Sequence, residues 1–179
     1  MHARSSVAGR SKTLSEGLAI PHRRDYVTAM KIALASDHAA LDLKTALAEW
    51  LSGDGHEVTD LGPHSPDSVD YPDFGYMLAD AVGTGDAERG IALCGSGIGI
   101  SIAVNRNPQV RCALVSEPLS AALSREHNDA NVLAMGARLT GIEMAKACVT
   151  AFLDTNYAGA RHQRRVDKLS HPDTARQEA

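Results

Sequence analysis

The sequence predicts a single-domain α/β protein with a three-layer α/β/α, Rossmann-like fold built on a five-stranded parallel sheet. From residue 30 to about residue 155, short apolar runs of strand length alternate with longer segments whose apolar residues recur at helical spacing. Five such runs occur with helices between them, which is the pattern of a parallel sheet covered on both faces. The chain has 179 residues, 44% of them hydrophobic, which suffices for one sizeable core.

In the first half of the domain, the apolar spacing predicts two strands and two helices. The predicted elements are a strand at 31–36, a helix over 43–51, a strand at 57–61, a loop over 62–72 and a helix over 74–82. The first helix is recognised by Leu43, Leu47 and Leu51, which lie on one stripe, and Gly53 ends it. The loop is indicated by its Pro and Asp content.

The second half continues the same alternation. The predicted elements are a strand at 89–94, a helix to about 105, a strand at 111–116, a helix from 118 toward 127, a strand at 131–135 and a long helix over 142–153. Pro118 suits the first turn of a helix because its missing N–H would be unpaired there in any case. Ile142, Val149 and Phe152 belong to the apolar stripe of the last helix.

The two ends of the chain differ from this domain in composition. Residues 1–29 carry five Arg or Lys against two acids and have no sustained apolar period, so we expect a disordered extension or an over-long start before Met30. They lack the apolar segment of a secretory signal, and Arg23-Arg24 lacks the one that a twin-arginine signal requires. Residues 156–179 are expected to form a basic, polar tail.

Composition excludes several classes of protein. A net charge of −4 argues against a general nucleic-acid binder, and no apolar run approaches the roughly 20 residues that span a membrane. The three cysteines, Cys94, Cys112 and Cys148, are widely spaced and form no CxxC pair. We therefore expect a cytoplasmic protein with neither a disulfide framework nor a cysteine metal site.

Polar residues follow four of the predicted strands. In parallel sheets, ligands bind outside the carboxyl ends of the strands, so these residues predict a site along one rim. They are Asp37-His38, Cys94 to Gly99, Ser116-Glu117 and Gly136 to Arg138.

The most informative of these stretches is Cys94-Gly95-Ser96-Gly97-Ile98-Gly99, where a strand ends in a thiol and a glycine-rich turn leads into a helix. Glycines allow a tight bend and a close approach to a ligand, and the first N–H groups of a helix can hold an anion. Cys94 is either a small buried apolar residue or a thiolate stabilised by these donors. Cys112 and Cys148 have no such setting and are expected in the core.

The same turn could belong to a dinucleotide fingerprint, since Glu117 lies about twenty residues further on. Against this, Ile100 occupies the third glycine position, and the turn follows the third strand rather than the first. A nicotinamide cofactor is therefore disfavoured.

Two further groups have open interpretations. His127-Asn128 is either a helix-end histidine beside a cap or a general acid or base with its partner. Arg161, Arg164 and Arg165 form either a solvated charge run or a phosphate clamp.

Taken together, six stretches of the chain resemble the type B ribose-5-phosphate isomerase family, in order and from about residue 30 to residue 169. The matching stretches are Asp37-His38, Asp70-Tyr71-Pro72, Cys94 to Ser101, Ser116-Glu117-Pro118, His127 to Leu133 and Arg161 to Val166. The broader family also includes isomerases of six-carbon sugar phosphates. Residues 1–29 lie outside the resemblance.

The resemblance implies reversible conversion of ribose 5-phosphate to ribulose 5-phosphate in the pentose phosphate pathway, without metal or organic cofactor. It also implies homodimers, sometimes dimers of dimers, in which each site combines residues of two chains. The basic tail would then complete the phosphate site of a partner subunit.

Roles for individual residues follow from the same resemblance. Cys94 would take the proton from C2, Ser96 would move a proton between O1 and O2, and His127 would open the sugar ring. Some relatives use a glutamate located elsewhere as the base, so the thiol assigns this chain to the cysteine branch. The substrate-binding residues would be Asp37, His38, Tyr71, Gly95, Gly97, Ile98, Gly99, Asn128, Arg138, Arg161 and Arg165.

Within that set, Asp37 and Tyr71 would contact sugar hydroxyls, and the turn N–H groups would hold the developing oxyanion. His38 and Arg138 would bind phosphate together with the tail arginines. Three alternatives stay open: a six-carbon sugar-phosphate isomerase, a non-catalytic sugar-phosphate or nucleotide binding module, and a nicotinamide oxidoreductase.

Overall fold

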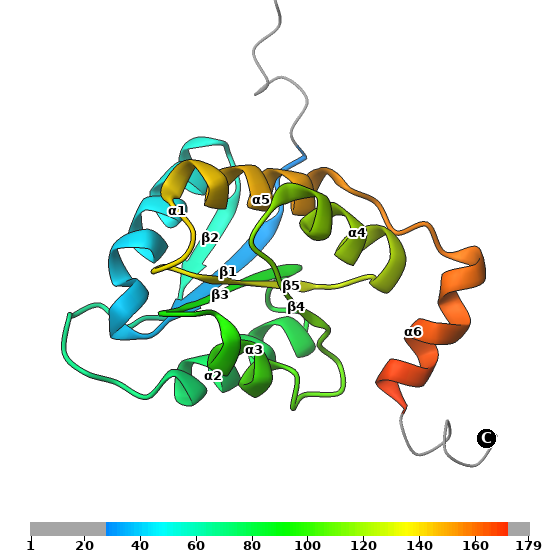
Figure 1. Ribbon diagram of the computed structural model, residues 1–179, viewed down its shortest axis with the longest axis horizontal. Helices are drawn as coiled ribbons and strands as arrows, with labels where there is room; N and C mark the ends of the chain where they lie inside the picture. The colour runs from blue at the N-terminus through cyan, green and yellow to red at the C-terminus, as the bar shows by residue number, and fades with distance from the viewer. Residues whose placement is uncertain (1–27, 172–179) are drawn as a thin grey trace, which may run out of the picture.

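A computed structural model describes residues 28–171 as one α/β domain in three layers (Figure 1). The strands are β1 (Lys31–Ser36), β2 (Glu57–Asp60), β3 (Arg89–Cys94), β4 (Cys112–Leu114) and β5 (Val132–Gly136). The helices are α1 (Leu41–Gly53), α2 (Tyr71–Gly83), α3 (Ile98–Val104), α4 (Pro118–Asn128), α5 (Ile142–Asp154) and α6 (Gln163–Ser170), with short 3-10 turns η2 (His38–Ala40) and η3 (Ala160–His162).

All five strands form one parallel sheet in the order β2-β1-β3-β5-β4. The predicted α/β/α class and the five-stranded parallel sheet are therefore confirmed. Beyond β1 the chain turns toward one edge of the sheet, and beyond β3 toward the other, so the strand order reverses between these two neighbours. This reversal opens a crevice at the carboxyl ends of β1 and β3.

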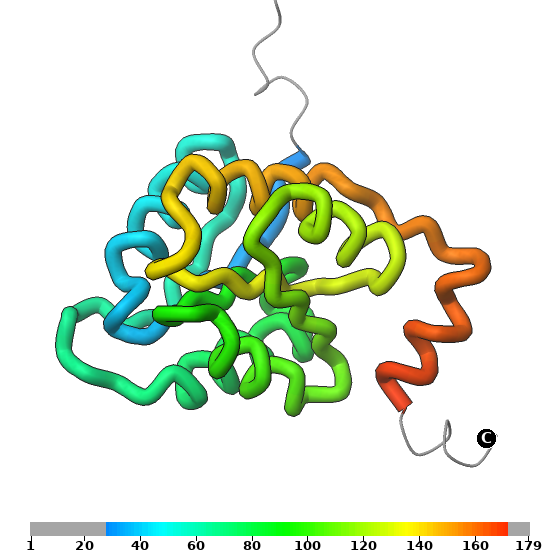
Figure 2. Tube along the Cα trace, viewed as in Figure 1, coloured from blue at the N-terminus to red at the C-terminus, as the bar shows by residue number. Residues whose placement is uncertain are grey.

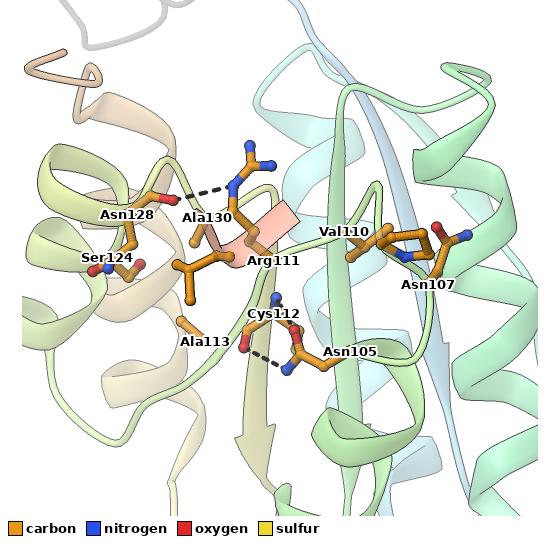
Figure 3. Close-up of a pocket in the computed structure, with 11 residues that line it drawn as sticks. Asn105, Asn107, Val110, Arg111, Cys112, Ala113, Ser124, Asn128 and Ala130 are labelled. Atoms are coloured by element: carbon orange, nitrogen blue, oxygen red, sulfur yellow. Dashed lines mark hydrogen bonds between the residues drawn. The ribbon is translucent and has the colours of Figure 1, made fainter. Parts of the chain in front are cut away.

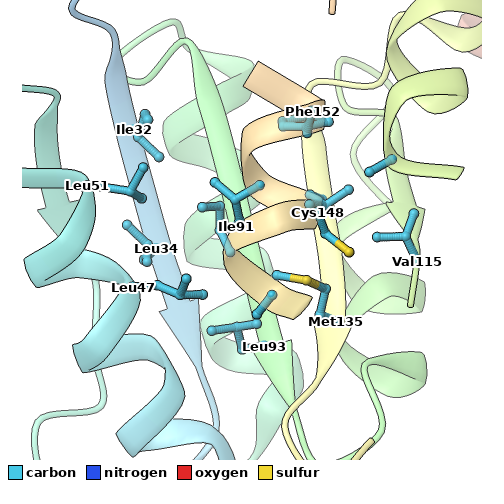
Figure 4. Packing of buried hydrophobic residues seen from close by; sticks show 14 of the residues in the cluster. Ile32, Leu34, Leu47, Leu51, Ile91, Leu93, Val115, Met135, Cys148 and Phe152 are labelled. Carbon is cyan, nitrogen blue, oxygen red and sulfur yellow. The ribbon is translucent and has the colours of Figure 1, made fainter. Parts of the chain in front are cut away.

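Two apolar clusters hold the layers together. On one face, α1, α4 and α5 cover the sheet, and Ile91 and Leu93 of the central strand pack with Leu47 and Phe152 (Figure 4). On the other face, α2 and α3 pack against the alternate side chains of the same strands, among them Cys94. The central strand β3 is thus buried on both faces, as its uninterrupted apolar sequence predicts.

Strand β4 is shorter than the predicted 111–116, and side-chain hydrogen bonds flank its start on both sides. The Asn105 side chain donates to the Cys112 carbonyl at 2.9 Å and accepts from the Cys112 N–H at 2.8 Å, as a neighbouring strand would. Asn131 Oδ1 accepts from the Arg111 N–H at 2.8 Å. The Asn105 bonds cover the free edge of β4, which would otherwise present unpaired backbone groups, whereas the Asn131 bond lies on the β5 side.

The tail contains a helix that the sequence analysis missed. Figure 2 shows α6 outside the three layers of the domain, and of its residues only Val166 is buried. The sequence analysis predicted no helix or strand in this basic, polar tail, and the structure adds a short helix to it. Residues 1–27 and 172–179, with the expectations made for them, lie outside the described residues.

Candidate functional site

The crevice at the carboxyl ends of β1 and β3 contains a cavity of about 310 Å³. It brings together eight residues that the sequence analysis proposed for the site. They are Asp37, His38, Tyr71, Cys94, Gly95, Ser96, Gly99 and Arg138, joined in the lining by Ala39 and Leu139. The rule that ligands bind at strand carboxyl ends therefore predicted that these residues lie around one cavity.

The Cys94 sulfur accepts a hydrogen bond from the Gly97 N–H at 3.0 Å and is 4% exposed. Gly97 has φ +78°, which side chains rarely adopt, and a Cβ there would lie 2.6 Å from Leu114 Cδ1 and 2.7 Å from the Met135 carbonyl carbon. Only glycine can therefore direct this N–H at the sulfur. The arrangement supplies a preorganised donor to negative charge on the thiol.

The residues that follow β5 hydrogen-bond to the start of the turn from Cys94 to Gly99. Ala137 N–H donates to the Cys94 carbonyl at 2.9 Å, and Arg138 N–H donates to the Gly95 carbonyl at 3.1 Å. The Arg138 side chain lies against Gly95, where a Cβ would be 3.3 Å from its Cζ. A fixed positive charge thus lies beside the amide-rich turn, as binding of an anionic ligand requires.

Tyr71 lies across the start of α3. A Cβ on Gly99 would come 2.5 Å from the Tyr71 Cζ, so the phenol ring can reach the turn only over a glycine. Tyr71 is 40% exposed and begins α2 directly after the loop over 62–70. Its hydroxyl is therefore available to a ligand at the rim of the cavity.

Asp37 and His38 are held in place by backbone groups. Asp37 is 8% exposed, and its carboxylate caps η2 by accepting from the Ala39 N–H at 3.0 Å. His38 Nδ1 accepts from the Val69 N–H at 3.2 Å, so the neutral ring carries its proton on Nε2. Both residues follow β1 and lie one strand away from Cys94.

Ser96 and Ile98 also border a second cavity of about 310 Å³ on the β4 side of the turn, which Ser116 and the side chain of Leu139 line as well. The Ser96 hydroxyl accepts from the Ile98 N–H at 3.3 Å. Among the residues of the turn from Cys94 to Gly99, Ser96 is the one that lines both cavities.

Glu117 does not line either cavity. Its carboxylate caps α4 by accepting from the N–H groups of Leu119 and Ser120, both at 2.6 Å. Hydrogen bonds from Ser120 and from Leu119 lower the pKa of this carboxyl. Occupied as a helix cap, it is not placed as the ribose-binding acid of a dinucleotide site.

Four proposed residues, His127, Asn128, Arg161 and Arg165, lie at the opposite end of the strands, the amino edge of the sheet, where the strands begin. Helix α4 begins after the carboxyl end of β4 and ends before the amino end of β5, so His127 and Asn128 are at the amino edge. Asn131, three residues beyond, accepts from Gly90 at the start of β3. Cys94 ends that same strand, so one chain does not bring Cys94 and His127 together.

At this amino edge, His127 stacks on His162 with ring centroids 4.5 Å apart and an interplanar angle of 9°. Arg161 Nε donates to His162 Nε2 at 3.2 Å. Arg165 lies one turn further along α6. His127, Arg161 and Arg165 therefore form a second, basic group at the junction of α4 and the tail.

Two arginines that the sequence analysis did not select position the His127-Asn128 turn. Asp129, with φ +46°, ends α4 and receives 2.8 Å ion pairs from Arg111 and Arg125. Arg111 Nε also donates to the Asn128 carbonyl at 3.1 Å. Nothing in the local sequence pattern predicts these contacts, because Arg111 is distant in sequence and Arg125 points inward from an amphipathic helix.

Asn128 itself lines a third cavity, of about 400 Å³, which Figure 3 shows between the β4 edge and α4. Leu169 of α6 contributes to the same lining. Cys112, another lining residue, is half-buried, and burial raises its pKa to about 12. Cys148 is fully buried as expected, so Cys112 is the one of these two cysteines that lies only partly in the core.

Among residues 28–171, no group of three His, Cys, Asp or Glu side chains could hold a metal ion. In the same part of the chain, no helix is long and apolar enough to cross a membrane.

Comparison with known proteins relates this arrangement to one family. The family model described as Ribose/Galactose Isomerase matches residues 32–169. Ribose-5-phosphate isomerase B of Escherichia coli is 46% identical over 140 residues, covering 78% of this chain and 94% of the relative. Galactose-6-phosphate isomerase subunit LacB of Clostridium acetobutylicum is 35% identical, covering 78% of this chain and 80% of the relative.

Solved structures give the same result. Ribose-5-phosphate isomerase B of Clostridium thermocellum superposes with a TM-score of 0.80 at 45% identity, covering 82% of this chain and 99% of that one. The Mycoplasma genitalium enzyme, solved with bound ribulose 5-phosphate, gives a TM-score of 0.76 at 41% identity, covering 80% of this chain and 95% of that one. The chain belongs to the ribose/galactose isomerase family.

Proposed function

We propose that this protein interconverts D-ribose 5-phosphate and D-ribulose 5-phosphate through an enediolate, without a cofactor, in the cytoplasm. The observation that carries the proposal is the thiol of Cys94, which faces an amide donor and borders a cavity with Asp37, His38, Tyr71 and Arg138. The relatives named ribose-5-phosphate isomerase, and the one solved with ribulose 5-phosphate, support the choice of substrate.

In this account, the Cys94 thiolate takes the proton from C2 of the open-chain aldose. The electron pair left on C2 forms the C1–C2 double bond, and the carbonyl oxygen on C1 becomes an oxyanion. N–H groups of the turn from Gly95 to Gly99 stabilise this charge. Ser96 passes a proton from O2 to O1, and the thiol returns its proton to C1, which completes the ketose with no net change in atoms.

Asp37 and Tyr71 would bind the sugar hydroxyls, and His38 and Arg138 would bind the phosphate. Ribose 5-phosphate arrives mainly as a ring, so an acid or base is also needed to open it. His127 is our candidate for this step, with Asn128 orienting the sugar.

We further propose a homodimer, which can pair into a dimer of dimers, in which His127, Asn128, Arg161 and Arg165 of one subunit complete the cavity of the other. The separation of these residues from Cys94 within one chain supports this. Large apolar side chains exposed beside the turn from Cys94 to Gly99 support the homodimer as well. Ile98 is 53%, Leu114 45% and Leu139 73% exposed. A second copy of the chain would remove this apolar surface from water.

A six-carbon sugar phosphate is the second candidate, favoured by the 35% identity to a galactose-6-phosphate isomerase subunit. The thiol base and the completeness of the motifs in one chain favour the five-carbon substrate. A non-catalytic binding module would hold the same ligands without turnover.

The test is a substrate panel. The purified protein in EDTA is assayed with ribose 5-phosphate, allose 6-phosphate and galactose 6-phosphate, and kcat/KM should be highest for ribose 5-phosphate. Preference for a hexose phosphate would select the second candidate. Tight binding of ribose 5-phosphate in calorimetry without any turnover would select the binding module.

A further inference from the structure

His162 adjoins the basic group at the amino edge and is more enclosed than His127, Arg161 or Arg165. It is 7% exposed, and its ring lies flat against the ring of His127. Its Nε2 atom accepts the hydrogen bond from Arg161 Nε at 3.2 Å. One imidazole therefore touches both the proposed ring-opening residue and a proposed phosphate ligand.

We propose that His162 is a positioning residue for both steps: its ring face orients His127, and its Nε2 holds the Arg161 guanidinium. The proposal builds on the proposed function, because it assigns those roles to His127 and Arg161. With Nε engaged by His162, the two Nη groups of Arg161 stay free to bind two phosphate oxygens.

This role requires His162 to be neutral, since a protonated ring has no acceptor for Arg161. The charged groups that face it are His127 and Glu126 from α4 and Arg161 and Arg165 from the tail. Burial, together with the positive charges of His127, Arg161 and Arg165, lowers the pKa of His162, and only Glu126 opposes the shift. The neutral ring then carries its single proton on Nδ1.

Backbone contacts keep the stacked pair together. Ala158 N–H donates to the Glu126 carbonyl at 3.0 Å, which fastens the start of the tail to the end of α4. His162 N–H donates to the Gly159 carbonyl at 2.9 Å, closing the turn that presents the ring. Movement of α6 relative to α4 would thus displace Arg161 and His127 together, through His162.

Two variants separate the two contacts of His162. His162→Phe keeps a flat ring against His127 but removes the acceptor for Arg161, so KM for ribose 5-phosphate should rise about tenfold with kcat within about twofold. His162→Gln keeps an acceptor but removes the stacking ring, so kcat should fall about tenfold with KM less affected. Gln163→Ala, an exposed neighbour that bonds Asp167 along α6, is the matched control.

Two readouts do not depend on turnover. Calorimetry with inorganic phosphate should give a Kd about tenfold weaker for His162→Phe than for the parent, and near the parent for His162→Gln. Imidazole nitrogen NMR of the unaltered protein at pH 6.5 should show His162 neutral with its proton on Nδ1.

A protonated His162 in that spectrum would overturn the proposal, as would kinetic constants of both variants that match the control. The same fall in kcat together with the same rise in KM in both variants would overturn it too, because that result indicates a merely structural role. If the unaltered protein fails to isomerise ribose 5-phosphate, the proposed function fails, while the NMR and phosphate measurements still decide the role of His162.

Discussion

Cys94 is the last residue of the central strand, and the turn that follows determines the surroundings of its sulfur atom. The Gly97 N–H points at the sulfur at 3.0 Å, while Cys112 and Cys148 receive no such contact among the described residues. Burial raises the pKa of both of those thiols, and for Cys148 the charge of Glu117 adds to it. Among the described residues, Cys94 is therefore the cysteine whose sulfur receives a backbone N–H.

Replacing Gly97 by Ala should remove activity and weaken the fold. The left-handed backbone alone costs about 1–2 kcal/mol for a residue with a Cβ, and the new carbon would meet the backbone of Met135 and Gly136 below 3.0 Å. We expect kcat/KM to fall at least about 100-fold, the effect of losing one oxyanion donor.

Gly141→Ala is the matched control, since a Cβ there meets nothing within 4 Å. Steady-state kinetics and urea unfolding of the two variants provide the comparison. Full activity in Gly97→Ala would show that the turn does not need its observed geometry.

At the residue scale, sequence reasoning found the cavity residues and missed those that support the second group. Asp37, Cys94 and Arg138 lie at the carboxyl end of a strand or within two residues of it, so a rule about strand ends finds them. Arg111, Arg125 and His162 act through contacts between elements distant in sequence, which periodicity and spacing do not describe. The resemblance to the family included His162 in a matching stretch but attached no role to it.

At the scale of elements, a charged side chain stabilises each end of helix α4. Glu117 caps its first turn, and Asp129 closes its last turn between two arginines. Because His127 belongs to that last turn, the stability of α4 determines where the proposed ring-opening residue lies. In the proposed account, α4 therefore positions a site residue as well as contributing to the core.

Glu117→Gln should destabilise the protein in a pH-dependent way. Hydrogen bonds lower the folded pKa below its ordinary value of 4.5, so the carboxylate contributes stability above that pH and loses it as the pH falls through the folded pKa. Gln retains an acceptor oxygen without the charge. Urea unfolding should show the parent to be more stable at neutral pH, with the difference shrinking as the pH falls below the ordinary carboxyl pKa of 4.5.

A difference between parent and variant that stays constant over this range would contradict the cap assignment. Glu143→Gln, an exposed acid in the first turn of α5 that pairs only with Lys146 among the described contacts, serves as the control.

The elements that the sequence predicted well are those that bury an apolar stripe or run. β1 and β3 match their predicted bounds, and the five core helices were all expected, because burial imposes a period on the sequence. β4 was predicted longer than its observed Cys112–Leu114, and the side chains of Asn105 and Asn131 bond the backbone at its start. α6 escaped prediction because it contributes only Val166 to any buried surface.

At the scale of the whole molecule, the parallel sheet separates the two groups of proposed site residues. Cys94 lies at the carboxyl edge and His127 at the amino edge, so a complete site needs a second chain in the proposed account. Sequence spacing did not show this separation, because it depends on the direction in which α4 crosses the sheet.

The shared site predicts complementation between inactive variants. Cys94→Ala and His127→Asn should each be inactive alone, since each lacks one group in every site. Co-refolded in equal amounts, they should recover about a quarter of the parent activity, because half of the dimers are mixed and each mixed dimer has one intact site. Absence of recovery, with mixed dimers demonstrated by mass spectrometry, would place each site within one chain.

The central claim is that the Cys94 thiolate removes the C2 proton of an open-chain sugar phosphate, and deuterium loss from C2-labelled ribose 5-phosphate measures this step directly. In EDTA-containing buffer, the parent protein should release the label during isomerisation, and Cys94→Ala should release it about 1,000-fold more slowly, within the range that a general base contributes. Cys148→Ala, at a buried position of the α5 core, should behave as the parent. Release of the label by Cys94→Ala at the parent rate would contradict the account.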